Sequence, residues 1–105
     1  MKTYCVIVTD DAKADLKRYR DYILNNFKNP QAAKALIFDF RETRRKLETI
    51  SASLQDPESE VLRQRGLKKI NFQRHNYFLL FRIVGDRVYV TNVFHFLEDY
   101  ENKLK

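Results

Sequence analysis

The alternation of hydrophobic and polar positions divides the chain into a strand, two helices and three further strands. β-Branched and aromatic residues fill positions 3–9, which predicts a strand. Apolar residues then recur every three or four positions over residues 12–27 and again over 33–54, which predicts two amphipathic helices. Asn29-Pro30 separates the two helices, because proline disfavours helical geometry in the preceding residue and fits the first turn of a new helix.

After the second helix the pattern changes. Gln55–Glu60 is polar and without period, so it is predicted to be a loop, which Gly66 ends. Short apolar runs then predict three strands joined by tight turns, with Gly85-Asp86 as a hairpin turn. The strands are predicted over Leu67–Phe72, Tyr77–Val84 and Arg87–Val93.

This order of elements predicts a two-layer α+β fold, β-α-α-β-β-β, for one domain spanning residues 1–105. The helices form an αα-hairpin that needs a sheet to cover its apolar faces, and the last three strands form an antiparallel meander. The first strand lies beside one strand of the meander, and the pattern leaves open which one. The charged tail, residues 97–105, is predicted to be either a short helix or a frayed end.

Composition narrows the class of protein. The chain has 105 residues, of which 44% are hydrophobic and 32% charged, as in a folded globular domain. One cysteine excludes a disulfide framework and a structural zinc site, and no cofactor or metal is expected. The longest apolar runs are too short for a membrane span or a signal peptide, so a soluble cytoplasmic protein without membrane partners is expected.

The charge balance is basic. Twenty Lys and Arg residues against 14 Asp and Glu residues give a formal net charge of +6. A basic surface attracts polyanions, either nucleic acid or an acidic protein.

The basic residues are concentrated between positions 63 and 87, where seven of them oppose only Asp86. On strands these charges are predicted to line the solvent side of the sheet, together with Tyr77, Tyr89, His75 and His95. Cations hold phosphates and aromatic rings stack on unpaired bases, so this mixture suits RNA, although an ordinary solvated sheet face has the same composition. The predicted nucleic-acid or target-binding residues are Arg65, Lys68, Arg74, Tyr77 and Arg87.

Three other features have structural interpretations, and the first of them also has a functional one. His95 at the end of the last strand is either a general acid or base, or a structural histidine bonded to backbone. Cys5 is predicted to be an inert thiol buried in the first strand. The basic cluster at residues 41–46 is predicted to be a solvated helix surface. Phosphate-loop, dinucleotide-binding and zinc-protease motifs are all missing.

Several short fragments, in a fixed order through nearly the whole chain, carry a family resemblance. They include Asn29-Pro30-x-Ala32-Ala33, Gly66-Leu67-Lys68-Lys69-Ile70, Asn76-Tyr77-Phe78-x-x-Phe81-Arg82-Ile83 and Val93-x-His95-x-x-x-Asp99-Tyr100. Together with the order of elements, they resemble the RelE/ParE superfamily of bacterial type II toxins.

This resemblance implies a growth-inhibiting toxin that an antitoxin encoded beside it, on a plasmid or the chromosome, holds inactive. The antitoxin would be acidic and partly disordered, and would wrap an extended or helical segment around the basic toxin. ParE-like members inhibit DNA gyrase without being enzymes, whereas RelE-like members cut mRNA on the ribosome. Residues 76–83, the Gly85-Asp86 turn and the late His-x-x-x-Asp-Tyr resemble the ParE-like branch more closely.

The RelE-like alternative implies an endoribonuclease site. Its catalytic residues would be Lys69, Arg82, His95 and Tyr100, in which the cations stabilise phosphorane charge and His95 or Tyr100 moves protons to activate a 2′-OH. Phe78 and Glu98 stand in regions where RelE-like sequences carry basic residues. These departures favour gyrase-type inhibition, or a degenerate toxin that only binds its antitoxin.

Overall fold

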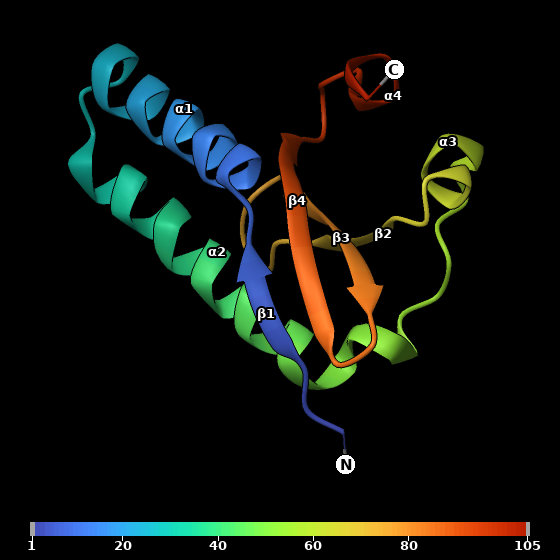
Figure 1. Cartoon of the computed structure of the whole chain (residues 1–105). Coiled ribbons are helices and arrows are strands. Elements are labelled where there is room, and N and C mark those ends of the chain that lie inside the picture. The colour runs from blue at the N-terminus through green and yellow to red at the C-terminus, as the bar shows by residue number, and fades with distance from the viewer. Residues whose placement is uncertain (1, 105) are drawn as a thin grey trace.

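The computed structural model describes residues 2–104 and confirms the predicted order of the main elements (Figure 1). The elements are β1 (Cys5–Val8), α1 (Asp10–Asn26), α2 (Pro30–Ile50), a 3₁₀ turn (Ser51–Ser53), α3 (Glu60–Gln64), β2 (Lys68–Asn71), β3 (Tyr77–Val84), β4 (Arg87–His95) and α4 (Tyr100–Lys103).

The four strands form one mixed sheet in the order β1-β4-β3-β2. The predicted meander is present, because β2 pairs antiparallel with β3 and β3 pairs antiparallel with β4. The neighbour of β1, which the sequence left open, is β4, and the two strands run parallel. The outer edge of β1 is therefore one edge of the sheet, and β2 forms the other.

Local capping explains the helix boundaries. The Thr9 hydroxyl accepts a hydrogen bond from the Ala12 amide at 3.3 Å, and two acidic residues follow in the first turn of α1. Lys28 adopts a left-handed conformation, with φ 47°, between the two helices. The Asn29 side chain then accepts from the Ala32 amide at 3.1 Å, and Pro30 occupies the first turn of α2 as predicted.

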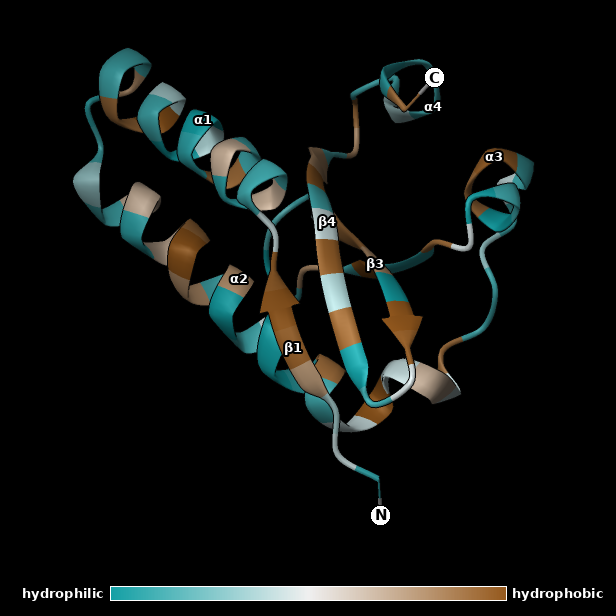
Figure 2. Ribbon diagram, viewed as in Figure 1, coloured by the Kyte–Doolittle hydropathy of each residue, from teal (hydrophilic) through white to brown (hydrophobic). Residues whose placement is uncertain are grey.

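The helix hairpin covers one face of the sheet and forms the main core with it (Figure 1). Hydrophobic and hydrophilic residues alternate along β4 and along both long helices, as their half-buried positions require (Figure 2). Burying these side chains is the principal stabilising contribution to the fold. The fully buried members include Leu36, Leu47, Leu79, Phe81 and Val88.

The opposite face of the sheet is covered at one end only, by α3 and α4 (Figure 1). The predicted loop extended to Gly66, but residues 60–64 within it form α3, because five residues are too few to show a helical period. The Ser59 side chain caps α3, and Gly66 leaves it with φ 68°, a conformation that glycine adopts without strain. Helix α4 confirms the helical alternative for the tail, whose last residue, Lys105, lies outside the described residues.

A buried carboxylate ties α2 to the turn between β2 and β3. The Asp39 side chain is almost fully buried and accepts hydrogen bonds from the Gln73 and Arg74 amides at 3.1 and 2.9 Å. His75 Nδ1 lies 2.7 Å from Asp39 Oδ2. Burial alone would raise the pKa of Asp39, but these hydrogen bonds outweigh it and hold the pKa below 3.8. His75 is thus part of a structural anchor.

We expect Asp39→Ala to lower the free energy of unfolding by about 3 kcal/mol, because it leaves two backbone amides and an imidazole without their acceptor. Urea denaturation followed by circular dichroism measures this. Asp21→Ala is the control, since Asp21 is part-exposed and pairs only with Arg20, so about 0.5 kcal/mol or less is expected. Equal losses of stability from the two substitutions would contradict the role of Asp39 as a structural anchor.

The pH dependence of stability provides a separate check. Because folding lowers the pKa of Asp39, its contribution is complete above the unfolded value of 3.8 and is lost as the pH falls through the folded value. The stability difference between the wild type and Asp39→Asn should therefore be constant near neutral pH and shrink in acid. A difference that grows in acid would contradict this assignment.

Candidate functional site

The part of the sheet that no helix covers presents a basic and aromatic surface. Strand register places two rows of residues across it, since paired residues share a face. One row is Ile7, Tyr89 and Arg82, and the other is Cys5, Arg87 and Val84. We call this surface, with the adjoining Arg65, the open face.

The guanidinium groups of the open face are held in different ways. The Arg82 guanidinium donates to the Arg65 carbonyl oxygen at 3.0 Å and so fixes the end of α3 to β3. The Arg87 side chain is exposed, and its interactions with Tyr89, Asp86 and Cys5 raise its pKa above the ordinary value. The open face therefore presents permanent positive charge beside an aromatic ring, which can bind phosphate groups or carboxylates.

Lys69 and Tyr100 lie on the same side of the sheet, where α4 covers it. The Lys69 ammonium sits 4.6 Å from the centre of the Phe78 ring, and the Tyr100 ring packs edge-on against the same ring at 5.2 Å. Lys69, Arg82 and Tyr100 thus share one face, together with the predicted binding residues Arg65 and Arg87.

The expectation that Tyr77 and His95 share this face is wrong. The two are cross-strand partners, and their rings meet at 4.8 Å on the side covered by the helix hairpin. The pairing register of β3 and β4 explains the position of His95. Leu80 pairs with Asn92 but Phe81 pairs with Val90, so Thr91 is an extra residue in β4. This bulge reverses the alternation beyond it and turns His95 away from the open face.

His95 lies instead beside a hollow of about 500 Å³ that α1 residues complete. Its Nδ1 accepts the Leu97 amide at 3.1 Å, which places the proton of the neutral imidazole on Nε2. Tyr19 packs edge-on against Tyr77 at 4.9 Å on the same side. His95 therefore lies among aromatic rings with its Nε2 free to donate a hydrogen bond, on the opposite side of the sheet from Lys69 and Arg82.

The other predicted binding residues also do not lie on the open face. Lys68 is turned to the helix side, where its ammonium donates to the Leu54 carbonyl oxygen at 2.7 Å. Arg74 and His75 belong to the turn between β2 and β3, and the Arg74 amide is bound to Asp39. Lys68 and Lys69 are adjacent in a strand, so they could not both point to one face.

The prediction that Cys5 is buried is wrong. Its thiol belongs to the exposed row of the open face, whereas Val6 and Val8, one and three positions further along β1, pack against the main core. An uninterrupted apolar run does not identify which alternate positions of an edge strand are buried.

The cluster at residues 41–46, predicted to be one solvated surface, is divided by the helix. Thr43 is fully buried, Arg45 and Lys46 are exposed, and Arg41 and Arg44 line a groove beside β1. Arg41 and Arg44 are three residues apart, so they lie on one side of the helix, next to the buried residues Phe40 and Leu47. This spacing could have indicated their position from the sequence.

Across residues 2–104, no group of three or more His, Cys, Asp or Glu side chains is arranged to bind a metal ion. None of the described helices is long and apolar enough to cross a membrane.

Comparisons with known proteins agree with this architecture. The family model described as "ParE toxin of type II toxin-antitoxin system, parDE" matches residues 6–100. Among curated proteins, no sequence matches. The match and the fold define the class as a toxin of a type II toxin–antitoxin system. Within that class, the chain belongs to the ParE toxin family.

Two solved structures share the fold. A chain of "Chromosomal ParDE TA system from P. aeruginosa" is 20% identical, with a TM-score of 0.75 over 89% of this chain and 96% of that chain. A chain of the toxin–antitoxin complex RelBE2 from Mycobacterium tuberculosis is 23% identical, with a TM-score of 0.59 over 90% and 93% of the two chains. At these identities the likeness shows the fold.

We expect the Cys5 thiol to react with a thiol reagent such as Ellman's reagent in the native protein, because its side chain is exposed. Labelling should be complete within minutes and should reach the same extent in urea. Cys5→Ser provides the blank. Reaction only after denaturant is added would contradict the placement of Cys5 on the open face.

Proposed function

We propose that this ParE-family toxin inhibits DNA gyrase by binding it through the open face, without catalysing a reaction. Gyrase inhibition is the precedent of the ParE-like branch, to which the family match assigns the chain. The proposal implies action in the bacterial cytoplasm, where gyrase works.

The observation that carries the proposal is the separation of the residues that a nuclease would use. Lys69 and Arg82 lie on one side of the sheet and His95 lies on the other. General acid–base catalysis needs the proton-transfer group within hydrogen-bond reach of the reacting atom, which the cations must also contact. A sheet between the two groups does not allow this.

The open face suits a protein target that handles DNA. Arg65, Arg82 and Arg87 give it positive charge, while Ile7, Val84 and Tyr89 supply apolar area for a protein contact. Arginine and tyrosine beside exposed aliphatic side chains are typical of residues that dominate protein interfaces.

The endoribonuclease alternative rests on a different observation. Lys69, Arg82 and Tyr100 share one face, so a site without His95 would place two cations beside a phenol that can transfer a proton. Under that alternative, Lys69→Ala and Arg82→Ala should each abolish ribosome-dependent shortening of mRNA, whereas His95→Ala should not. A toxin that has lost both activities and only binds its antitoxin would be inactive in either assay.

We also propose a cognate antitoxin as the partner that neutralises the toxin. An acidic, partly disordered segment complements a domain with a formal net charge of +6 and gains affinity as it folds on binding.

A supercoiling assay with purified bacterial gyrase tests the proposal. We expect the wild type to inhibit supercoiling and Arg87→Glu with Tyr89→Ala to need about tenfold more protein for half inhibition, equivalent to about 1.4 kcal/mol of binding free energy. These substitutions change exposed or half-exposed positions and should leave the fold intact.

Lys46→Glu is the matched control, since it makes the same charge change on the exposed side of α2. Its potency should equal that of the wild type. Uninhibited gyrase together with shortened mRNA in a cell-free translation reaction would overturn the proposal in favour of the nuclease. Equal loss from Lys46→Glu would indicate that net charge, and not the open face, determines inhibition.

A further inference from the structure

A hollow of about 500 Å³ lies where α1 meets the start of β3 and the end of β4. Tyr19, Tyr22 and Ile23 supply the α1 part of its lining, at a spacing that puts them on one side of the helix. Tyr77 and His95 supply the part from the sheet. The Tyr19 hydroxyl accepts a hydrogen bond from the His95 amide at 3.3 Å and so joins the two parts. We call this site the aromatic hollow.

Two rings of the lining remain largely exposed. Tyr22 is 56% and Phe27 is 66% exposed, and their rings meet edge-on at 5.7 Å. Phe27 is fixed at the end of α1, because its amide donates to the Ile23 carbonyl oxygen at 3.2 Å before Lys28 turns the chain. An edge-on contact covers at most one face of one ring. The two side chains therefore keep ring faces free to stack on a planar group.

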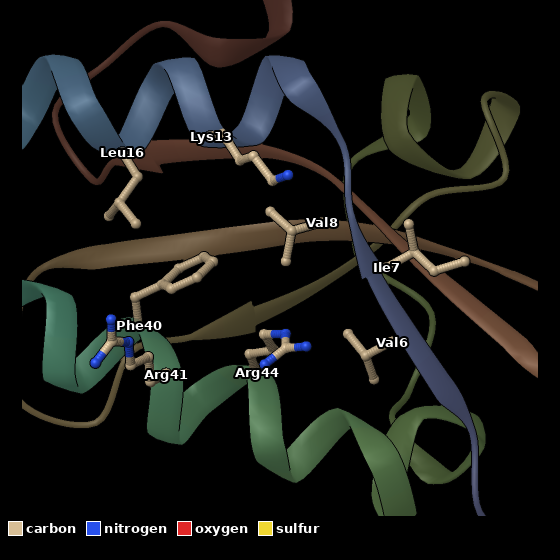
Figure 3. Close-up of a pocket in the computed structure, with 8 residues that line it drawn as sticks. All are labelled: Val6, Ile7, Val8, Lys13, Leu16, Phe40, Arg41 and Arg44. Carbon is tan, nitrogen blue, oxygen red and sulfur yellow. The ribbon is translucent and has the colours of Figure 1, made fainter.

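Both charged side chains of the lining already have partners. Arg18 pairs with Asp15 at 3.3 Å, and its guanidinium lies 5.0 Å from the centre of the Tyr19 ring. Glu98 pairs with Lys103. The aromatic hollow is thus internally neutralised. The groove beside β1 differs, since it is lined by three cations that form no salt bridge within residues 2–104, namely Lys13, Arg41 and Arg44 (Figure 3).

Neutral hydrogen-bonding groups complete the lining. Because the His95 Nδ1 accepts the Leu97 amide, the neutral imidazole carries its proton on Nε2, which no acceptor within residues 2–104 bonds. Burial and the nearby Tyr22 phenol raise the pKa of Tyr77, so the Tyr77 phenol is neutral at physiological pH and can donate or accept a hydrogen bond. The aromatic hollow therefore combines open ring faces with neutral polar groups.

This combination fits a planar, neutral ring that carries hydrogen-bonding atoms. A nucleobase has both properties, since it stacks on aromatic side chains and presents acceptors at its edge. The volume also lies within the range of small-molecule sites, about 300–1,000 Å³. A quaternary ammonium ligand binds aromatic rings too, but here it would meet the Arg18 guanidinium beside Tyr19. A hydrocarbon ring would leave the His95 donor without an acceptor.

We propose that the aromatic hollow binds a nucleobase, which stacks on Tyr22 and Phe27 and accepts a hydrogen bond from His95. The base belongs either to a free nucleotide or to an unpaired DNA strand, and its recognition is the same in both. This binding goes beyond gyrase inhibition and gives a function to His95, which the open face does not use. The aromatic hollow and the open face lie on opposite sides of the sheet, so both can be occupied together.

The test uses the deoxyribonucleoside of 2-aminopurine, whose fluorescence is quenched when the base stacks on an aromatic ring. We expect saturable quenching by the full chain, with a dissociation constant of about 1 mM or lower. Tyr22→Ala and Phe27→Ala should each raise the dissociation constant about tenfold, because each removes a stacking ring. His95→Phe keeps a ring but removes the donor, and should raise it about fivefold.

Phe38→Ala is the matched control. It removes a ring of similar exposure, 52%, from α2 outside the aromatic hollow, and should leave the dissociation constant within about twofold. Far-ultraviolet circular dichroism checks that each variant is folded. Absence of saturable quenching, or equal weakening by Phe38→Ala, would overturn the proposal.

Competition against the probe identifies the ligand chemistry. Deoxyadenosine should displace the probe, whereas inorganic phosphate should not. Displacement by indole or by choline as readily as by deoxyadenosine would overturn the proposal, by assigning the hollow to any aromatic side chain or to a cation. A short single strand of deoxyadenosines that displaces the probe at a lower base concentration than deoxyadenosine supports a strand as the source. Equal or weaker displacement by the strand supports a free nucleotide.

These measurements contain no gyrase. Failure of the nucleobase proposal therefore leaves the supercoiling result standing, and absence of gyrase inhibition leaves the quenching result standing.

Discussion

Parallel pairing between β1 and β4 requires the intervening chain to return to the end of the sheet from which β1 started, because parallel strands cannot be joined by a tight turn. The helix hairpin begins this return and closes one face of the sheet as it does so. The same pairing makes β4 an inner strand and leaves the outer edge of β1 free. The main core, the open face and the free outer edge of β1 all follow from it.

The two faces of the sheet consequently carry different kinds of side chains. On the hairpin side, Tyr77 and His95 lie among aromatic and aliphatic side chains next to α1. On the other side, α3 and α4 cover Phe78 and Phe94 and leave the arginine rows exposed. This arrangement leaves a basic surface free to bind a target. A reaction that needs His95 and Arg82 at the same substrate cannot occur, because the sheet separates the two side chains. This favours a ParE-like inhibitor over a RelE-like nuclease.

Much of the fold was predictable because it depends on local pattern. Pro30 marked the second helix, Gly85 the last hairpin, and β3 has its predicted bounds. The site was less predictable. Strict alternation of side chains along β3 from Arg82 would have placed Tyr77 on the helix side. Nothing in the sequence marks Thr91 as a bulge, so the side of the sheet on which His95 lies could not be predicted. The exposure of Cys5 and the position of Arg44 in a groove beside β1 depend on strand order, which is a tertiary property.

We propose that the chain acts on DNA topology and not on RNA. The most direct measurement is the linking number of a reporter plasmid, with the length of abundant transcripts, in bacteria shortly after the protein is induced. We expect relaxed plasmid and full-length transcripts before growth stops. Normally supercoiled plasmid with cleaved transcripts would contradict it.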